Sequence, residues 1–322
     1  MKKYLVITID VEPDCSGDWK YSDPLLFRGV TEGVAKRLQP LFNKYHVAPT
    51  YLINNVVLED RRSVETFCSL DGKFELGTHL HPEFIQPDRQ FENYAGKKAV
   101  ANCCFYPPDI EFEKIKNITS LFREVFGYNP KCFRAGRFSA GKNTLNSLSR
   151  LNYQVDSSVT PHINWNDKTR ERPVDFTFAP EQPYLADEDS IIRESSRGKL
   201  LEVPVSIALK RRNYFREIIS SAGGLRHGFR KYKPVWIRPS FSSAEEMIYV
   251  AEQHSSAHPD RQHVVYNMMF HNVEVVPGLS PYTSSEEDCS KFMDRLEAFL
   301  LYCDKTAVKS VTLSDLYHVF SK

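Results

Sequence analysis

The stretch YLVITIDVE, residues 4–12, is an apolar run that ends in two acidic residues. A short continuous run of this kind is typical of a strand that is buried on both faces, as in a parallel sheet. Because side chains alternate along a strand, Asp10 and Glu12 point to one face, and Ile9 and Val11 point to the other. The stretch therefore predicts a first, buried strand with two carboxylates at its carboxyl end.

Strands and helices alternate along the rest of the chain. Apolar residues recur at helical spacing at positions 30, 34, 38, 41 and 42, and a helix is expected from about Asp60. The last long helix has an apolar face, with Ser284 and Glu287 as its predicted capping box. Further strands are predicted near residues 48–53, 73–80, 131–135, 153–156, 200–205, 235–237 and 263–270. This alternation predicts an α/β fold with a mostly parallel sheet or barrel.

Two segments interrupt the alternation. Residues 82–109 and 160–198 are polar, rich in Pro, Asp and Arg, and too long to be simple connections. In a barrel, the long loops that follow strands build the active face, so these segments are candidate substrate walls. The alternative is that these segments are solvated surface loops that do not contact a substrate. No stretch resembles a linker between domains, and the sequence predicts one domain over residues 1–322.

The composition limits the classes of partner. A net charge of +1 gives no electrostatic argument for nucleic acid or for an anionic membrane surface. No apolar run reaches the roughly 18 residues of a membrane span, and the run that ends at Ile9 is too short for a secretory signal. The seven cysteines are scattered and lack any Cys-x-x-Cys spacing. These features together favour a reduced, cytoplasmic setting with structural thiols.

The stretch GTHLHPE, residues 77–83, places two histidines two residues apart at the end of a predicted strand. A single His-x-His is more often incidental than catalytic. Strand alternation, however, puts His79 and His81 on one face, and parallel strand ends meet at one rim, where Glu12 is also expected. Two histidines and one carboxylate, with a position left open for water, form a recurrent catalytic zinc arrangement that also suits other first-row metals.

A third cluster supplies the missing acid. The stretch MMFHNVEVVPG places His271 at the end of another apolar strand. Hydrolysis of an amide or ester needs a base to take a proton from water and an acid to protonate the leaving group. Asp10 beside Glu12 allows one carboxylate to bind an ion while the other stays free as the base. His271 is then the candidate acid, with a structural histidine as the alternative.

These residues resemble the motifs of the NodB-type polysaccharide deacetylases, carbohydrate esterase family 4. Thr8-Ile9-Asp10 is similar to the start of the first motif, and His81-Pro82 is similar to the end of the second. Residues 133–136, FRAG, resemble the third motif, residues 153–161 the fourth, and His271 the fifth. The motifs span residues 8–271, most of the chain. The variants DVE, HLHP, FRAGR and FHNVE are most similar to the branch named WalW-like, which is associated with surface-glycan biosynthesis.

Two positions depart from the family's motifs. Val11 replaces the second Asp of the first motif, a metal ligand, so the resemblance passes that role to Glu12. The family spaces its two metal-binding histidines four residues apart, and His79 matches the first of them only if two intervening residues are missing. His81 fits the pattern better than His79.

The resemblance implies a distorted (β/α) barrel of about seven strands and a metal-dependent hydrolase. The enzyme would remove an acetyl group from an amino sugar or glycan precursor, and an acetylated sugar would be its partner. One divalent ion, Zn²⁺ before other first-row metals, would be held by Glu12, His79 and His81. The catalytic set would be Asp10 as base, Arg134 holding Asp10, His271 as acid, and Asp156 orienting His271 or lining the groove.

Two alternatives remain at this point. Residues 136–144, GRFSAGKNT, nearly spell a phosphate-binding loop with Lys142 as its lysine, but Asn143 replaces the Ser or Thr that would bind magnesium. An inactive glycan-binding protein on the same scaffold is the other, although binding alone needs neither Asp10 nor His271. Aromatic residues could stack on a sugar in either case, or simply pack: Trp19, Tyr94, Phe105, Tyr106, Trp165 and Trp236.

Overall fold

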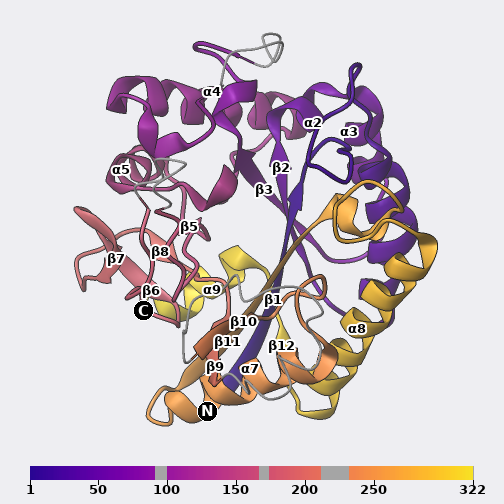
Figure 1. Cartoon of the computed structure of the whole chain (residues 1–322). Helices are drawn as coiled ribbons and strands as arrows, with labels where there is room; N and C mark the ends of the chain where they lie inside the picture. The colour runs from indigo at the N-terminus through magenta and orange to yellow at the C-terminus, as the bar shows by residue number, and fades with distance from the viewer. Residues whose placement is uncertain (91–99, 167–173, 212–231, 322) are drawn as a thin grey trace, which may run out of the picture.

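The computed structural model describes residues 1–90, 100–166, 174–211 and 232–321 (Figure 1). Its strands are β1 (Lys2–Val11), β2 (Thr50–Asn54), β3 (Glu75–Leu80), β4 (Cys132–Ala135), β5 (Val155–Asp156), β6 (Tyr184–Asp187), β7 (Ser190–Glu194), β8 (Leu201–Glu202), β9 (Ile207–Arg211), β10 (Tyr232–Trp236), β11 (His263–His271) and β12 (Lys309–Ser310). Its α-helices are α1 (Gln39–Lys44), α2 (Asn55–Glu59), α3 (Arg61–Cys68), α4 (Pro108–Phe126), α5 (Lys142–Arg150), α7 (Ala244–Ala257), α8 (Glu286–Lys305) and α9 (Leu313–Phe320). A π-helix, η1 (Gly29–Leu38), precedes α1. Short 3-10 helices are η2 (Pro82–Phe84), η4 (Cys103–Phe105), η5 (Gly136–Phe138) and η6 (Asn272–Val275).

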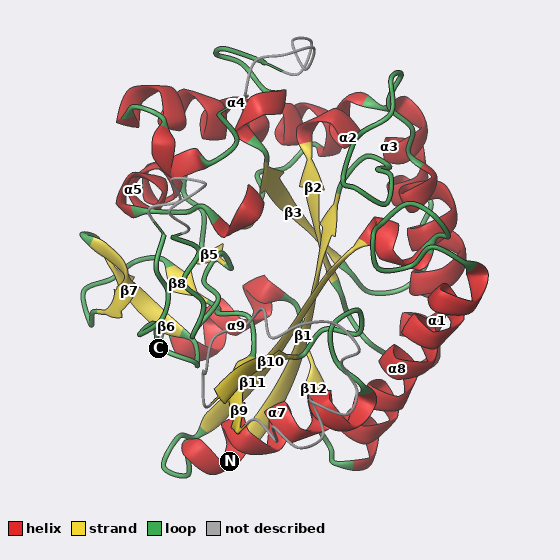
Figure 2. Ribbon diagram, viewed as in Figure 1, coloured by secondary structure: helices red, strands yellow, loops and turns green. Residues whose placement is uncertain are grey.

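A curled, mostly parallel sheet forms the centre of the molecule (Figure 2). Its order is β11-β1-β2-β3-β4-β5-β8-β6-β7, and the first seven strands of this order pair in parallel. β6 and β7 add an antiparallel edge, and β12 pairs with β1. The sequence-based prediction of a mostly parallel sheet or barrel is confirmed.

The curl of the sheet brings β11 back toward the far side of β8. Asn267 of β11 exchanges hydrogen bonds with Ser206, which follows β8: the backbone N–H of Ser206 donates to the Asn267 carbonyl over 3.0 Å, and the Asn267 N–H donates to Ser206 Oγ over 2.9 Å. The Ile237 N–H then donates to the Ser206 carbonyl over 2.9 Å. These bonds bridge the opening of the barrel without a regular strand pair.

Alternation along β1 separates two apolar clusters. Ile7 and Ile9 pack in the larger cluster, whereas Tyr4 and Val6 pack in a smaller one together with Leu316 of α9. Beyond Val6, the same face of β1 carries polar residues, including Thr8 and Asp10, both buried. Apolar residues therefore fill one end of the barrel, and the polar residues gather at the carboxyl ends of the strands, where the site lies.

Two helix predictions differ in detail from the structure. The helix predicted from Val30 exists, but residues 29–38 wind as a π-helix before α1 begins. The last long helix is capped by Ser285 and Asp288 rather than by Ser284 and Glu287. Asp288 takes this role because its Oδ2 accepts hydrogen bonds from both serines.

All seven cysteines are free thiols. Within the described residues, we find no helix that combines the length and the apolarity needed to cross a bilayer.

Candidate active site

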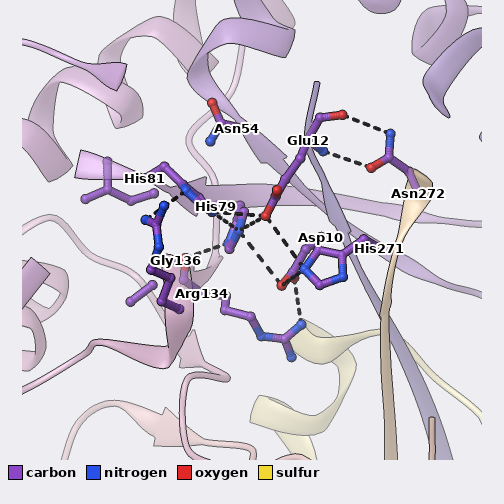
Figure 3. Close-up of polar contacts among 12 residues, drawn as sticks. Asp10, Glu12, Asn54, His79, His81, Arg134, Gly136, His271 and Asn272 are labelled. Atoms are coloured by element: carbon purple, nitrogen blue, oxygen red, sulfur yellow. Dashed lines mark hydrogen bonds and ion pairs between the residues drawn. The ribbon is translucent and has the colours of Figure 1, made fainter. Parts of the chain in front are cut away.

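The candidate site lies where the carboxyl ends of β1, β3, β4 and β11 meet. Parallel pairing places Asp10 beside His271 in the register of β1 and β11, and His79 beside Arg134 in the register of β3 and β4. Glu12 follows β1 directly and is almost fully buried. Figure 3 shows these side chains converging on one point. The predicted convergence of strand ends therefore brings the candidate residues of four strands together.

Glu12, His79 and His81 form a compact ligand set. Glu12 Oε1 lies 3.0 Å from Nε2 of each histidine, and the two Nε2 atoms are 3.1 Å apart. Ligand atoms about 2.0 Å from a tetrahedral zinc ion lie roughly 3.3 Å from one another, so these spacings fit one ion with little adjustment. Three mutually adjacent lone-pair atoms repel each other unless a cation or proton lies between them. The donor set therefore fits a first-row divalent metal.

The outer nitrogen of each histidine fixes its orientation. His79 Nδ1 donates to the Arg134 carbonyl over 3.1 Å, which leaves Nε2 of a neutral ring free to bind an ion. His81 Nδ1 lies 3.5 Å from Glu83 Oε1, and Glu83 is fully buried. A carboxylate or carbonyl behind each histidine is the usual outer support of a metal site.

The electrostatics of this cluster favour positive charge. Burial raises the pKa of Glu12, but the charge of His81 and hydrogen bonds from both histidines hold that pKa well below its usual range. Burial lowers the pKa of His81, but Glu12 and Glu83 outweigh it and raise the pKa to about 9. The carboxylates thus draw a cation to the point where the two Nε2 atoms meet.

Asp10 is held as a carboxylate by Arg134. Arg134 Nη1 donates to Asp10 Oδ1 over 2.8 Å, and both side chains are buried. Burial raises the pKa of Asp10, but Arg134 and the nearby histidines outweigh it, and the net pKa is lowered. Arg134 is itself fixed by Thr8 and Ser157, to which its other nitrogens donate over 2.6–2.8 Å. The arrangement leaves Asp10 Oδ2 directed toward His79 and His271.

His271 lies beside both Asp10 and Glu12, and Glu274 supports it. His271 Nε2 lies 4.0 Å from Asp10 Oδ2, and His271 Nδ1 lies 2.6 Å from Glu274 Oε1. Glu274 also pairs with Arg238. Burial lowers the pKa of His271, but the hydrogen bond to Glu274 and the charge of Glu12 raise it above its ordinary value. Glu274 therefore orients His271 and stabilises its protonated form.

The structure puts Glu274, not Asp156, beside His271. Asp156 is fully buried; its Oδ1 accepts from Ser158 Oγ over 2.7 Å, and it pairs in register with Glu202 of β8. Burial and the Asp156 carboxylate raise the pKa of Glu202 well above its usual range. Neither Asp156 nor Glu202 lines the cavity described below, and the two carboxyl groups form a buried pair beside it.

Sequence reasoning missed Glu274, Arg238, Glu83 and Asn272. Glu274 follows His271 by three residues, a spacing that turns both side chains to the same side in η6. Asn272 exchanges two hydrogen bonds with the backbone of Glu12, over 2.9 and 3.1 Å (Figure 3). The only signal for them in the sequence was that polar residues cluster in HNVE and in HPE, where the two histidine-bearing strands end.

A cavity of about 420 Å³ opens over these residues. Six aromatic rings form a continuous arc around it, with successive ring centroids 5.2–6.3 Å apart, in the order Trp19, Tyr282, Phe241, Trp236, Phe138 and Trp165. The predicted stacking candidates Trp19, Trp165 and Trp236 thus line the cavity, whereas Tyr94 lies outside the described residues. Aromatic walls with a few convergent polar groups are typical of small-molecule sites.

The residues of the nucleotide-binding alternative lie elsewhere. Lys142 begins α5, is 55% exposed, and pairs with Asp189 over 2.5 Å. It does not line the cavity that holds Asp10 and His271.

Comparison with known proteins gives the fold. No family profile and no curated protein matches the sequence. Solved structures do match: a protein described as a polysaccharide deacetylase from Mycobacterium smegmatis (14% identity, TM-score 0.55, 99% of this chain and 91% of that chain), and one described as a glycoside hydrolase/deacetylase from Parabacteroides distasonis (10%, 0.60, 99% and 71%). A GH57-type branching enzyme from Pyrococcus horikoshii also matches (10%, 0.52, 99% and 70%). The predicted fold class, the distorted barrel of polysaccharide deacetylases, is confirmed.

Proposed function

We propose that this chain is a metal-dependent hydrolase that removes the acetyl group from an N-acetylated amino sugar. The observation that carries the proposal is a held base and a held acid side by side at one candidate metal site. Asp10 is paired with Arg134, and His271 is paired with Glu274. Asp10 Oδ2 lies 3.8 Å from His79 Nε2, and His271 Nε2 lies 3.7 Å from Glu12 Oε1, so both border the group of Glu12, His79 and His81. We further propose that the ion is Zn²⁺, that the chain is a member of the WalW-like branch, and that it acts in surface-glycan synthesis.

The residues divide the chemistry of amide hydrolysis. A divalent ion held by Glu12, His79 and His81 supplies Lewis acidity at the acetyl carbonyl. Asp10, ionised because Arg134 faces it, accepts a proton from the attacking water. The C–N bond then breaks as His271 Nε2 gives its proton to the departing nitrogen. The products are acetic acid and a free amine, and transfer of the acid's proton to the amine or to solvent leaves acetate. The proton on Asp10 balances the one that His271 donated.

Release of acetate from N-acetylated sugars tests this function. We expect the zinc-supplemented protein to release acetate and free amine in equal amounts from at least one acetylated hexosamine or its oligomer. A chelator should remove this activity, and adding Zn²⁺ or Co²⁺ should restore it. If the protein binds such sugars, carries metal, and yet releases no acetate from them, the glycan-binding alternative replaces the hydrolase.

Glu274→Gln is expected to move the alkaline limb of the pH–rate profile to lower pH. A general acid works only while it is protonated, so activity falls as the pH rises through the pKa of His271. Glu274 raises that pKa against the effect of burial, and the amide of Gln cannot replace its charge. Above neutral pH we expect kcat/KM to fall at least about tenfold. Glu202→Gln, a buried carboxyl outside the cavity, is the control; an identical limb in Glu274→Gln and wild type would contradict the assignment.

A further inference from the structure

Two successive residues at the wall of the cavity have left-handed backbone conformations. Arg137 has φ 55° and Phe138 has φ 53°, although neither is glycine. Gly136, just before them, lies so close to the His81 ring that an added Cβ would be 2.7 Å from it. Conformations of this kind are strained in non-glycine residues and concentrate at functional sites. Here the turn aims both side chains into the cavity.

Arg137 is anchored on one side only. Its Nη1 donates to the Ala101 carbonyl over 2.9 Å and pairs with Glu83 Oε1 over 2.8 Å. Within the described residues, Arg137 makes no hydrogen bond through Nε or Nη2. Glu83 is fully buried behind the guanidinium, whereas the Arg137 side chain is 28% exposed. Arg137 lines the cavity and Glu83 does not, so the cavity meets the cation of this pair rather than its carboxylate.

The other arginine that lines the cavity, Arg238, is already paired with groups of the protein. Arg238 is only 4% exposed, pairs with Glu274, and donates to Ser240 Oγ over 2.9 Å. The aromatic arc, which includes Phe138 next to Arg137, supplies no cation. Arg137 is thus the lining cation whose remaining N–H groups can reach a bound molecule, and a guanidinium edge matches the oxygens of a carboxylate or phosphate.

We propose that Arg137 binds an anionic group, a carboxylate or a phosphate, on the acetylated sugar, and so determines which sugar the site accepts. This inference rests on the proposed function for the position of the acetyl group. Arg137 Nη1 lies 3.3 Å from His81 Nδ1, so one imidazole ring separates the guanidinium from the ligand set. The guanidinium is therefore farther from the ligand atom His81 Nε2 than 3.3 Å, by the width of the ring. The carbonyl oxygen of an acetamido group and the outer oxygens of an anionic group on the neighbouring ring carbon each lie two or three bonds beyond the ring, so they can span a separation of this size. The anionic group is therefore on a carbon next to the one that bears the acetamido group.

Calorimetric titration of an inactive, zinc-supplemented protein tests this assignment. In the Asp10→Asn background, the probes are N-acetylglucosamine, its 1-phosphate, its 6-phosphate, and N-acetylmuramic acid, which carries a carboxylate beside the acetamido carbon. Charge-assisted hydrogen bonds predict that the 1-phosphate or the muramic acid binds roughly 10- to 100-fold more tightly than the neutral sugar. The 6-phosphate, with its charge remote, should gain little. Whichever of the two adjacent anions binds more tightly identifies the group as phosphate or carboxylate.

A matched pair of variants separates recognition from folding. Removing Arg137 alone would leave Glu83 buried and unpaired, which is strongly destabilising. We therefore compare Glu83→Gln with the double variant Glu83→Gln, Arg137→Gln. The first should keep the anion preference, and the second should lose it while still binding about one zinc ion per chain. Equal affinity for neutral and anionic sugars, an equal gain for the 6-phosphate, or a preference that survives in the double variant would overturn the proposal.

Acetate release, measured on the same sugars with Asp10 intact, keeps the two proposals apart. Arg137-dependent binding without acetate release would remove the hydrolase and leave the anion site. Acetate release without any anion preference would remove the anion site and leave the hydrolase.

Discussion

His81→Ala is expected to abolish metal binding and with it all hydrolysis. The wild-type protein should retain about one first-row divalent ion per chain after dialysis without chelator, and the variant close to none. His81 supplies one of three ligand atoms that lie within 3.1 Å of one another, and alanine leaves only Glu12 and His79 to hold the ion. Elemental analysis of the two proteins, side by side, measures the effect.

His258→Ala is the matched control for this loss. A second carboxylate–histidine group, Glu181 with His254 and His258, lies outside the cavity. His254 is already engaged there on both ring nitrogens, with the Gln182 amide over 2.8 Å and the Ile207 carbonyl over 3.2 Å. We expect His258→Ala to keep its metal. An ion lost in His258→Ala and kept in His81→Ala would place metal binding at the second group and contradict the site proposed here.

The convergence of the candidate ligand residues was predictable because it depends on two simple regularities. Side chains alternate along a strand, and the carboxyl ends of parallel strands share a rim. These rules alone put Asp10 and Glu12 on one side of β1, and His79 and His81 on one side of β3. They required no knowledge of how far apart the strands lie in the sequence.

The residues that support the site were not predictable in the same way. Asp156 looked available as a partner for His271, but the parallel pairing of β5 with β8 places Glu202 beside it, and no local pattern reveals that register. Arg238 follows β10, a strand outside the main sheet, and reaches Glu274 only through the tertiary fold. The aromatic arc likewise draws its rings from separate segments, so spacing in the sequence gave no sign of it.

Asp10→Asn is expected to lower kcat by about 10²–10⁴-fold while metal binding is unchanged. Asparagine keeps the size of the side chain and can still accept the hydrogen bond from Arg134, but it cannot take a proton from water. Arg134 then loses its carboxylate partner in a fully buried position, so the free energy of unfolding should also fall, by about 3–5 kcal/mol. Steady-state acetate release at saturating sugar measures the first effect, and thermal or urea unfolding measures the second.

Two further variants show whether a loss of activity in Asp10→Asn is specific to the proposed base. Asp175→Asn removes an exposed carboxylate outside the cavity and should leave kcat unchanged. Lys142→Ala tests the phosphate-loop alternative, because Lys142 is the residue on which that alternative depends. Full activity in Asp10→Asn together with loss of activity in Lys142→Ala would reject Asp10 as the base. The expected result is loss of activity in Asp10→Asn and full activity in Lys142→Ala, with metal retained in both variants. Asp10 would then be needed for the chemistry and not for binding the ion, because His81 and its partners remain intact when the base can no longer accept a proton.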